Sequence, residues 1–367
     1  MATGTTVLSD ADVRRARLRS LLLAKGPRRS VLEVAEWFGA IQAQDLASGA
    51  WSFGVRATGL TEAHVQAAQE NREVLRTWPM RGTVHFVPAR DAAWMVALMD
   101  KKPLAGGAAR REFLGLTLSQ VDRAVSALTD ALAGGRVLTR DECVTVLREA
   151  GLPTEGQRSY HWLWYACQVG ALAQGPPRGK EHTFVLLSDW VPDAASPSRD
   201  EGLAIMARRY FQSHGPDTEK DFSRWTGLGL RECREGIAIV VDELVRVDTS
   251  AGPMLAAVSV LDSAQAVRRH LVLPGFDEYM LGYGDRSLVV DPSHFGAVVP
   301  GNNGVFQATL VRDGLTVGIW KRALKPKTAD VSVTELVPMT DVDRRAFDRE
   351  FDAYGKFVGR EPRVNWP

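Results

Sequence analysis

The side chains that most often carry catalysis are spread thinly along this sequence. Its seven histidines and three cysteines form no metal-ligand spacing such as HxxxH, HExxH or CxxC. The GxxxxGK[ST] loop that cradles nucleotide phosphates and the GxSxG turn of a serine nucleophile are also missing. These absences argue against zinc hydrolases, P-loop enzymes and nucleophile-elbow hydrolases.

Cationic side chains gather in small clusters, although the chain is nearly neutral overall. Lys and Arg number 45 against 44 Asp and Glu, so the net charge is only +1. Clustered cations would contact DNA phosphates and give salt-dependent affinity without reading sequence. Any single pair is also typical of a solvated surface. The clusters are Arg28 with Arg29, Lys101 with Lys102, Arg110 with Arg111, Arg178 with Lys180, and Lys321 with Arg322, Lys325 and Lys327.

Length and composition describe an ordinary globular protein. The 367 residues suggest two to four domains, and 45% of them are hydrophobic against 24% charged. Three widely separated cysteines exclude a disulfide framework and fit a reducing compartment. The sequence shows no signal-like segment and no apolar run long enough to span a membrane. We therefore expect a cytoplasmic protein.

Three times along the chain, predicted helices lead into a predicted β-hairpin. In the first instance Ser9 and Ser30 cap helices, and strands at 74–78 and 83–87 flank a turn that contains Arg81, a further candidate for contacting DNA. The second instance has helices from 118 and 139 and strands at 171–174 and 183–187. The third has helices from 200, 218 and 231, with strands near 245–247 and 255–260. Helices followed by a hairpin form a winged helix, whose commonest ligand is duplex DNA, although it also serves as a protein-binding module.

The last hundred residues differ from the preceding part in their predicted secondary structure. Asn302-Asn303-Gly304 and Arg312-Asp313-Gly314 are turn signals between apolar runs, and a charged helix is expected at 341–356. The predicted fold is therefore α+β and mainly helical, with three tandem winged helices and a small C-terminal β-rich domain. The expected boundaries are 1–100, 101–192, 193–265 and 266–367.

Three segments of this sequence resemble one protein family. They are Gly39–Asp45 (GAIQAQD), Arg76–His85 (RTWPMRGTVH) and Leu273–Arg286 (LPGFDEYMLGYGDR). Together they are similar to the AlkZ/YcaQ superfamily of winged-helix DNA glycosylases, in the family's own order and over nearly the whole chain. The resemblance implies tandem winged helices with a C-terminal β domain, which agrees with the separate reading of the elements.

The resemblance also implies a catalytic pair, Gln42 and Gln44. In the AlkZ branch the motif is Gln-apolar-Gln, and that branch protects antibiotic producers from azinomycin-type alkylators by unhooking interstrand crosslinks. The YcaQ branch would carry a carboxylate in place of Gln44, and here Asp45 follows one residue later. The Gln-Ala-Gln sequence at residues 42–44 therefore resembles the motif of the AlkZ branch.

A pair of amides suits one kind of substrate. Guanine alkylated at N7 is cationic, so it leaves readily and needs little acid catalysis. A neutral amide is no general base near pH 7, but its oxygen can accept a hydrogen bond from an attacking water and its nitrogen can donate one. Residues two apart lie on one side of an extended segment, whereas they diverge by about 200° in an α-helix. The hypothesis therefore requires Gln42 and Gln44 to lie outside a helix.

These observations lead to one main hypothesis and two alternatives. The main hypothesis is a monofunctional, monomeric glycosylase that acts on duplex DNA carrying N7-alkylated guanine, with no metal and no organic cofactor. The alternatives are a non-enzymatic DNA-binding regulator and a protein that sequesters the alkylating drug itself. His85, Asn302 and Asn303 are candidates for lining the site, and either C-terminal turn could probe the minor groove. We expect Trp162 and Trp164 to be core residues, and Asp277, Glu278, Asp285 and Arg286 to form a salt-bridged corner.

Overall fold

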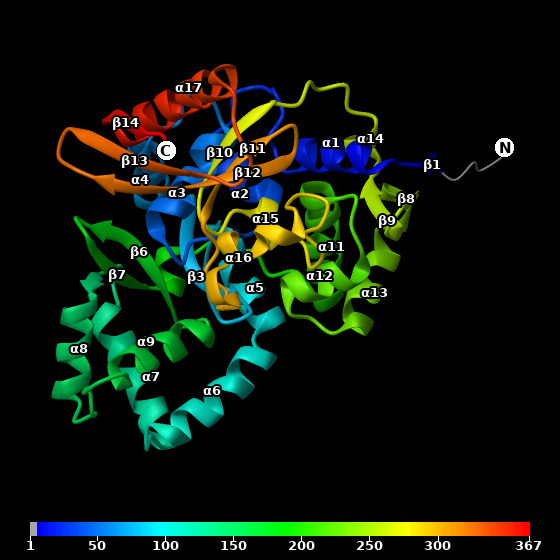
Figure 1. Cartoon of the computed structure of the whole chain (residues 1–367). Coiled ribbons are helices and arrows are strands. Elements are labelled where there is room, and N and C mark those ends of the chain that lie inside the picture. The colour runs from blue at the N-terminus through cyan, green and yellow to red at the C-terminus, as the bar shows by residue number, and fades with distance from the viewer. Residues whose placement is uncertain (1–5) are drawn as a thin grey trace. The chain divides into compact units, whose positions relative to one another are not determined.

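Helices and short strands alternate along the chain, which confirms the α+β class (Figure 1). The structure is a computed structural model that describes residues 6–367. Contacts divide the chain into two units. Unit 1 comprises the chain up to Val65, Leu203–Trp225 and Gly229–Pro367, and unit 2 comprises Gln66–Gly202 and Thr226–Leu228. The expected domain boundaries stay a prediction.

Unit 2 contains an antiparallel sheet with strands in the order β4-β3-β6-β7-β5. The hairpin β3–β4 confirms the strands expected on either side of Arg81. Farther along, helix α7, strand β5, helices α8 and α9 and hairpin β6–β7 follow one another, with β5 paired to β7 as in a winged helix. The elements are β3 (Val74–Met80), β4 (Thr83–Pro88), α5 (Ala92–Met99), α6 (Lys101–Phe113), α7 (Leu118–Leu132), β5 (Val137–Thr139), α8 (Arg140–Glu149), α9 (Arg158–Gln168), β6 (Leu172–Arg178), β7 (Glu181–Leu186) and α10 (Leu187–Trp190).

Local capping explains where several helices begin. The Thr139 hydroxyl accepts a hydrogen bond from the backbone N–H of Glu142, and the Glu142 carboxylate accepts one from the backbone N–H of Thr139, as expected from the sequence. Helix α6 was not expected. It lacks a side-chain cap at Asp100 and contains two adjacent glycines, so its sequence carries no clear start signal and has weak helix propensity.

Unit 1 contains two further sheets, ordered β1-β8-β9 and β10-β11-β12-β13-β14. Helix α17 packs on β10, β14 and α3, and its aromatic side chains meet Trp51 and Trp320 edge-on in the core. The helices are α1 (Asp10–Ser20), α2 (Val31–Phe38), α3 (Leu46–Arg56), α11 (Arg199–His214), α12 (Glu219–Thr226), α13 (Leu230–Ile239), α14 (Val258–Leu261), α15 (Glu278–Leu281), α16 (Phe295–Val298) and α17 (Asp341–Val358). The strands are β1 (Thr6–Val7), β2 (Ile41–Gln42), β8 (Leu244–Thr249), β9 (Gly252–Ala257), β10 (His270–Leu273), β11 (Ala308–Arg312), β12 (Leu315–Leu324), β13 (Thr328–Glu335) and β14 (Glu361–Asn365). Helix α4 (Glu62–Glu70) crosses the division between the units. So do α11, whose first four residues belong to unit 2, and α12, whose last residue, Thr226, belongs to unit 2.

One of the two C-terminal turns was predicted wrongly. Asp313 and Gly314 have positive φ and join β11 to β12 in a two-residue hairpin, as expected. Asn302 instead ends a 3-10 helix (Pro300–Asn302), and residues 289–307 contain no strand on either side of it. An Asn-Asn-Gly run tolerates left-handed backbone wherever it occurs, so it marks the end of a short helix as readily as a hairpin.

Candidate functional site

The segment from Gly39 to Asp45 leaves helical geometry, as the glutamine hypothesis requires. Helix α2 ends at Gly39 with φ of 78°, and β2 covers Ile41 and Gln42. Helix α3 then begins after Asp45, whose side chain accepts a hydrogen bond from the Ser48 backbone at 2.6 Å. The two glutamines thus lie on the short extended link between two helices.

The two amides differ in their surroundings. Gln42 is only 8% exposed, and its Oε1 is buried without a hydrogen-bond partner among residues 6–367. Gln44 is exposed at the surface. A buried polar atom without a partner costs free energy, but the amide oxygens of Gln168 and Gln174 are also buried without one in the part of the chain that the structure describes. The unpartnered Oε1 of Gln42 therefore gains its significance from its place in the glutamine motif.

A buried carboxylate behind the link holds Gln42 by its backbone. Oε1 of Glu278 accepts a hydrogen bond from the Gln42 backbone N–H at 3.3 Å. Oε2 of the same carboxylate accepts from the indole of Trp225 at 2.9 Å and lies 3.2 Å from Nε2 of His214. Burial lowers the pKa of His214 below its usual value. Glu278 therefore ties the link to helices α11 and α12.

Asp277 and Glu278 form the charged corner that was expected, but Asp285 and Arg286 do not join it. The Asp277 carboxylate accepts hydrogen bonds from both terminal nitrogens of Arg56 at 2.8 and 2.9 Å, and both side chains are buried. Arg286 instead donates to the backbone oxygens of Met280 and Gly284, and Asp285 accepts from the backbone of Ser287. The corner thus joins α15 to the end of α3.

A glycine lets helix α3 approach the glutamine link closely. A Cβ atom on Gly49 would lie 3.0 Å from the Cα of Ala43 and 3.1 Å from the backbone oxygen of Gln42. Because such contacts are tighter than nearly all real Cβ contacts, any larger residue must push the link or the helix aside.

Asp45 has a structural environment of its own. Its carboxylate accepts from Arg322 of strand β12 at 2.5 Å, and Arg322 also donates to the hydroxyl of Ser48 at 3.2 Å. Burial acts to raise the pKa of Asp45, but the Arg322 guanidinium and the hydrogen bonds from Ser48 outweigh it and hold this pKa below its usual value. Asp45 is thus an ionised helix cap that anchors strand β12 beside the link.

Most of the predicted DNA-contacting cations are exposed, and some have partners. Arg178 pairs with Glu142 at 3.1 Å, and Arg110 donates to Gln157. Arg322 is largely covered by its pairing with Asp45. The exposed cations are Arg28, Lys101, Lys102, Arg110, Arg178, Lys180 and Lys321, while Arg29, Arg81, Arg111 and Arg322 are half-buried.

The residues considered for lining the site lie in different places. His85 is fully buried in β4, with Nδ1 2.8 Å from the backbone oxygen of Thr83 and Nε2 3.5 Å from Arg81. Asn302 and Asn303 are exposed in unit 1. The sequence alone did not single out His214 or Trp225, because the residues that meet at Glu278 are distant along the chain. Of these residues, only Glu278 had a signal in the sequence, because it lies in the PGFDEY stretch that carries part of the family resemblance.

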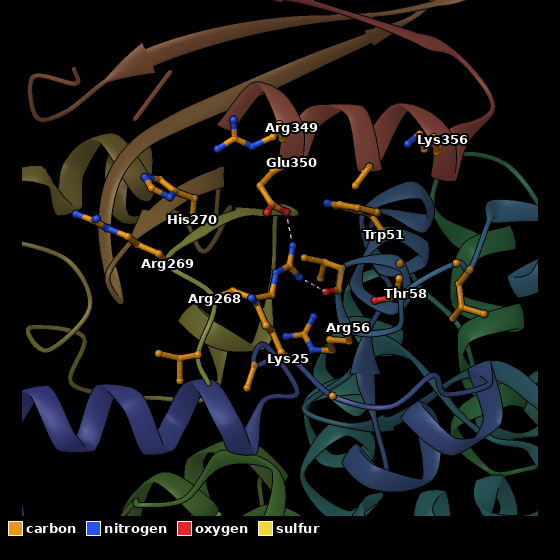
Figure 2. Close-up of a pocket in the computed structure, with 18 of the residues that line it drawn as sticks. Lys25, Trp51, Arg56, Thr58, Arg268, Arg269, His270, Arg349, Glu350 and Lys356 are labelled. Carbon is orange, nitrogen blue, oxygen red and sulfur yellow. Dashed lines mark hydrogen bonds and ion pairs between the residues drawn. The ribbon is translucent and has the colours of Figure 1, made fainter. Parts of the chain in front are cut away.

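Figure 2 shows a cavity of about 800 Å³ at the other end of α3, where Arg56, Arg268 and Arg349 face it. Its cations are largely engaged in holding the fold. Arg268 donates to Glu350 and, at 2.7 Å, to the backbone oxygen of Val55, and Arg56 is paired as described above. Lys356 lies in the last turn of α17, where a cation complements the helix dipole. This cavity lies a helix length away from the glutamine link.

Residues 6–367 contain neither a candidate metal site nor a candidate membrane span. No group of three or more His, Cys, Asp or Glu side chains among them could hold a metal ion. No helix in this part of the chain is long and apolar enough to cross a membrane.

Comparison with known proteins places the chain among its relatives. Residues 35–357 match the model of the family described as DNA glycosylase AlkZ-like. The chain belongs to the AlkZ-like DNA glycosylase family. It is 29% identical over 330 residues to the interstrand DNA cross-link repair glycosylase of Streptomyces sahachiroi, which covers 83% of this chain and 85% of that protein.

The structural comparison agrees with the family assignment. The structure of the Streptomyces sahachiroi DNA glycosylase AlkZ superposes on 98% of this chain and 100% of that one, with a TM-score of 0.79 and 25% identity. As an AlkZ-like glycosylase, this chain is an enzyme that acts on DNA. The regulator and drug-sequestering alternatives were therefore wrong as accounts of the whole protein.

Proposed function

We propose that this AlkZ-like glycosylase hydrolyses the N-glycosidic bond of cationic N7-alkylguanine in duplex DNA, and that Gln42 and Gln44 carry the reaction. The observation that supports this assignment is the unpaired, buried Oε1 of Gln42 on a non-helical link whose other glutamine is exposed. The chain thus maintains a hydrogen-bond acceptor that its own side chains leave unused.

The chemistry needs little more than this. In our proposal the Gln42 side chain shifts when DNA binds, so that Oε1, which is buried in the free protein, accepts a hydrogen bond from the attacking water. The exposed amide of Gln44 meets the deoxyribose side of the lesion. The water oxygen bonds to the anomeric carbon, the bond to the purine breaks, and the purine leaves with the electron pair that neutralises its positive charge. The excess proton of the water passes to solvent. Neutral lesions such as uracil lack this driving force and should be poor substrates.

The surface around the link fits a DNA backbone. Strand β12 and its turn into β13 carry Lys321 and Lys327 on exposed positions, together with Lys325, which pairs with Asp330 at 2.5 Å. Arg322 fastens the same strand to Asp45 at the link. These cations would contact phosphates on either side of a lesion and give affinity that falls with salt.

We extend the proposal to the fold, with three tandem winged helices over 1–265 and a β-rich part after them.

The finer substrate assignment is also proposed. The Streptomyces sahachiroi relative is named for interstrand DNA cross-link repair. We infer that the present enzyme also unhooks crosslinks and thereby supports resistance to a genotoxic alkylating natural product. A base tied to the opposite strand cannot be rotated fully out of the duplex, so an exposed glutamine such as Gln44 suits such a lesion better than a closed pocket.

The test is base release from defined DNA. A duplex with a single N7-methylguanine and one with a nitrogen-mustard crosslink are each incubated with the full chain, and abasic sites and unhooked strands are counted. Gln44→Ala should abolish most release with unchanged stability and DNA affinity, since this side chain is exposed. Gln42→Leu, which keeps the volume and removes the acceptor, should do the same. Full activity of both variants would refute the assignment, and rapid uracil release would refute the proposed cation requirement.

A further inference from the structure

Unit 2 contains a pocket that plays no part in the chemistry above. It has a volume of about 530 Å³ and lies between helices α6 and α9, which pack against each other (Figure 1). We propose that this pocket binds a nucleotide, with the base stacked on Trp164 and the phosphate held by Lys102 and Arg110. The proposal does not depend on the roles of Gln42 and Gln44.

One face of helix α6 forms a wall of the pocket. Lys102, Gly106 and Arg110 are spaced four residues apart, so they follow one another along the same side of the helix. The glycine at the centre leaves room between the two cations. Both cations are exposed, and the Arg110 guanidinium is oriented by its hydrogen bond to Gln157.

The two glycines of α6 have different explanations. A Cβ atom on Gly107 would lie 2.4 Å from the Trp164 ring, so this glycine is needed for the indole to pack on the helix backbone. A Cβ atom on Gly106 would meet nothing within 4 Å among the described residues. A glycine inside a helix costs about 1 kcal/mol relative to alanine. Packing therefore does not account for Gly106, whereas a pocket that must stay open does.

Aromatic rings form the opposite wall. Trp164, Tyr160 and His161 of α9 line the pocket, and the imidazole lies 5.6 Å from the indole, centroid to centroid. Burial lowers the pKa of His161, so this ring is neutral near pH 7 and behaves as part of an aromatic surface. The expectation of a core position was correct for Trp162, which is 1% exposed, but wrong for Trp164, which is half-buried at the pocket.

A nucleotide matches these walls better than other small molecules do. Its flat base would stack on the indole, as bases do on aromatic side chains of single-strand binding proteins. Its phosphate would reach the two cations on α6, and the volume falls in the range of small-ligand pockets. An apolar ligand would leave the cations unused, and inorganic phosphate would leave the aromatic wall unused. The nucleotide comes either from an unpaired DNA strand or from the free nucleotide pool.

Two probes separate these sources. Binding of 2′-deoxyguanosine 5′-monophosphate to the full chain is measured by calorimetry, and binding of a fluorescein-labelled oligothymidylate of about 12 nucleotides is measured by anisotropy. Gly106→Leu fills the pocket and should weaken at least one probe about tenfold, the size expected for one stacked base. Ala105→Leu adds the same side chain to the same helix outside the pocket and should leave both affinities unchanged.

The pattern of losses decides the outcome. Loss of mononucleotide binding assigns the pocket to free nucleotides, and loss confined to the oligonucleotide assigns it to a strand. Lys102→Ala should weaken the nucleotide but not the nucleoside 2′-deoxyguanosine, because only the nucleotide carries the phosphate. If neither probe binds, or if Gly106→Leu and Ala105→Leu have equal effects while circular dichroism shows intact helix, the proposal is wrong.

Discussion

Replacing Glu278 by glutamine tests whether the glutamine link is held from behind by its backbone. The carboxylate accepts from the Gln42 backbone N–H on Oε1 at 3.3 Å and from the Trp225 indole on Oε2 at 2.9 Å, and Oε2 also lies 3.2 Å from Nε2 of His214. An amide of the same shape has a single acceptor oxygen. The hydrogen bond from the indole is the shorter of the two, so the amide oxygen should turn toward Trp225. Its NH₂ group would then face the backbone N–H of Gln42, and that hydrogen bond is lost.

The size of the effect follows from that one bond. A hydrogen bond to a charged acceptor contributes about 1.5–3 kcal/mol, and the buried N–H left behind adds to the cost. The free energy of unfolding in urea should therefore fall by about 2 kcal/mol. Release of N7-methylguanine under single-turnover conditions should slow, because the link carrying Gln42 shifts, while the Kd for duplex DNA should stay within about twofold.

Glu243→Gln is the matched control for Glu278→Gln. Glu243 pairs with Arg208 at 2.6 Å, but both side chains are nearly half exposed, so its loss should cost less than about 1 kcal/mol and leave base release unchanged. A Glu278→Gln protein that is less stable but cleaves at the full rate would show that this carboxylate supports the fold without positioning the link. Unchanged stability would contradict the hydrogen bond from the Gln42 backbone to this carboxylate.

Three further outcomes follow from particular contacts. Gly49→Ala should slow base release without weakening DNA binding in anisotropy, since the new Cβ lies 3.0 Å from Ala43 and moves the link. Hydrogen bonding from His270 and Thr340 lowers the pKa of Asp343, so this carboxylate stabilises the fold above about pH 4 and loses that contribution as the pH falls. In thermal melts from pH 6 downward, Asp343→Asn should therefore lose less stability than the unmodified protein, and parallel curves would contradict this. All three cysteines are buried and none of them forms a disulfide, so a thiol reagent should modify them only in denaturant, and rapid labelling of the native protein would contradict their burial.

Local sequence signals predicted much of the secondary structure, because capping acts over three or four residues. Ser30 with Glu33 and Thr139 with Glu142 start helices where the sequence indicated. The same local logic missed helix α6, which lacks a capping side chain. It also placed a hairpin at Asn302, where a 3-10 helix ends.

The candidate site was predictable only in part. The family resemblance pointed to Gln42 and Gln44, and the i, i+2 spacing indicated that their segment must be extended. The support of that segment depends on Glu278, which lies 236 residues away from Gln42, and no spacing rule connects residues at that separation. The pocket on α9 was likewise hidden, because a tryptophan in an aromatic helix is usually a core residue.

The burial of Gln42 gives a physical reason for an amide, rather than a carboxylate, at the position proposed to bind the attacking water. An ionised side chain buried without a partner would cost several kcal/mol or would take up a proton and lose its function as an acceptor. It would also lie close to the buried carboxylate of Glu278, which already accepts from the backbone of the same residue. A neutral amide can keep an unpaired acceptor for about 1–3 kcal/mol. A site that relies on the positive charge of its leaving group can use this weaker acceptor, because the lesion itself supplies most of the driving force for bond cleavage.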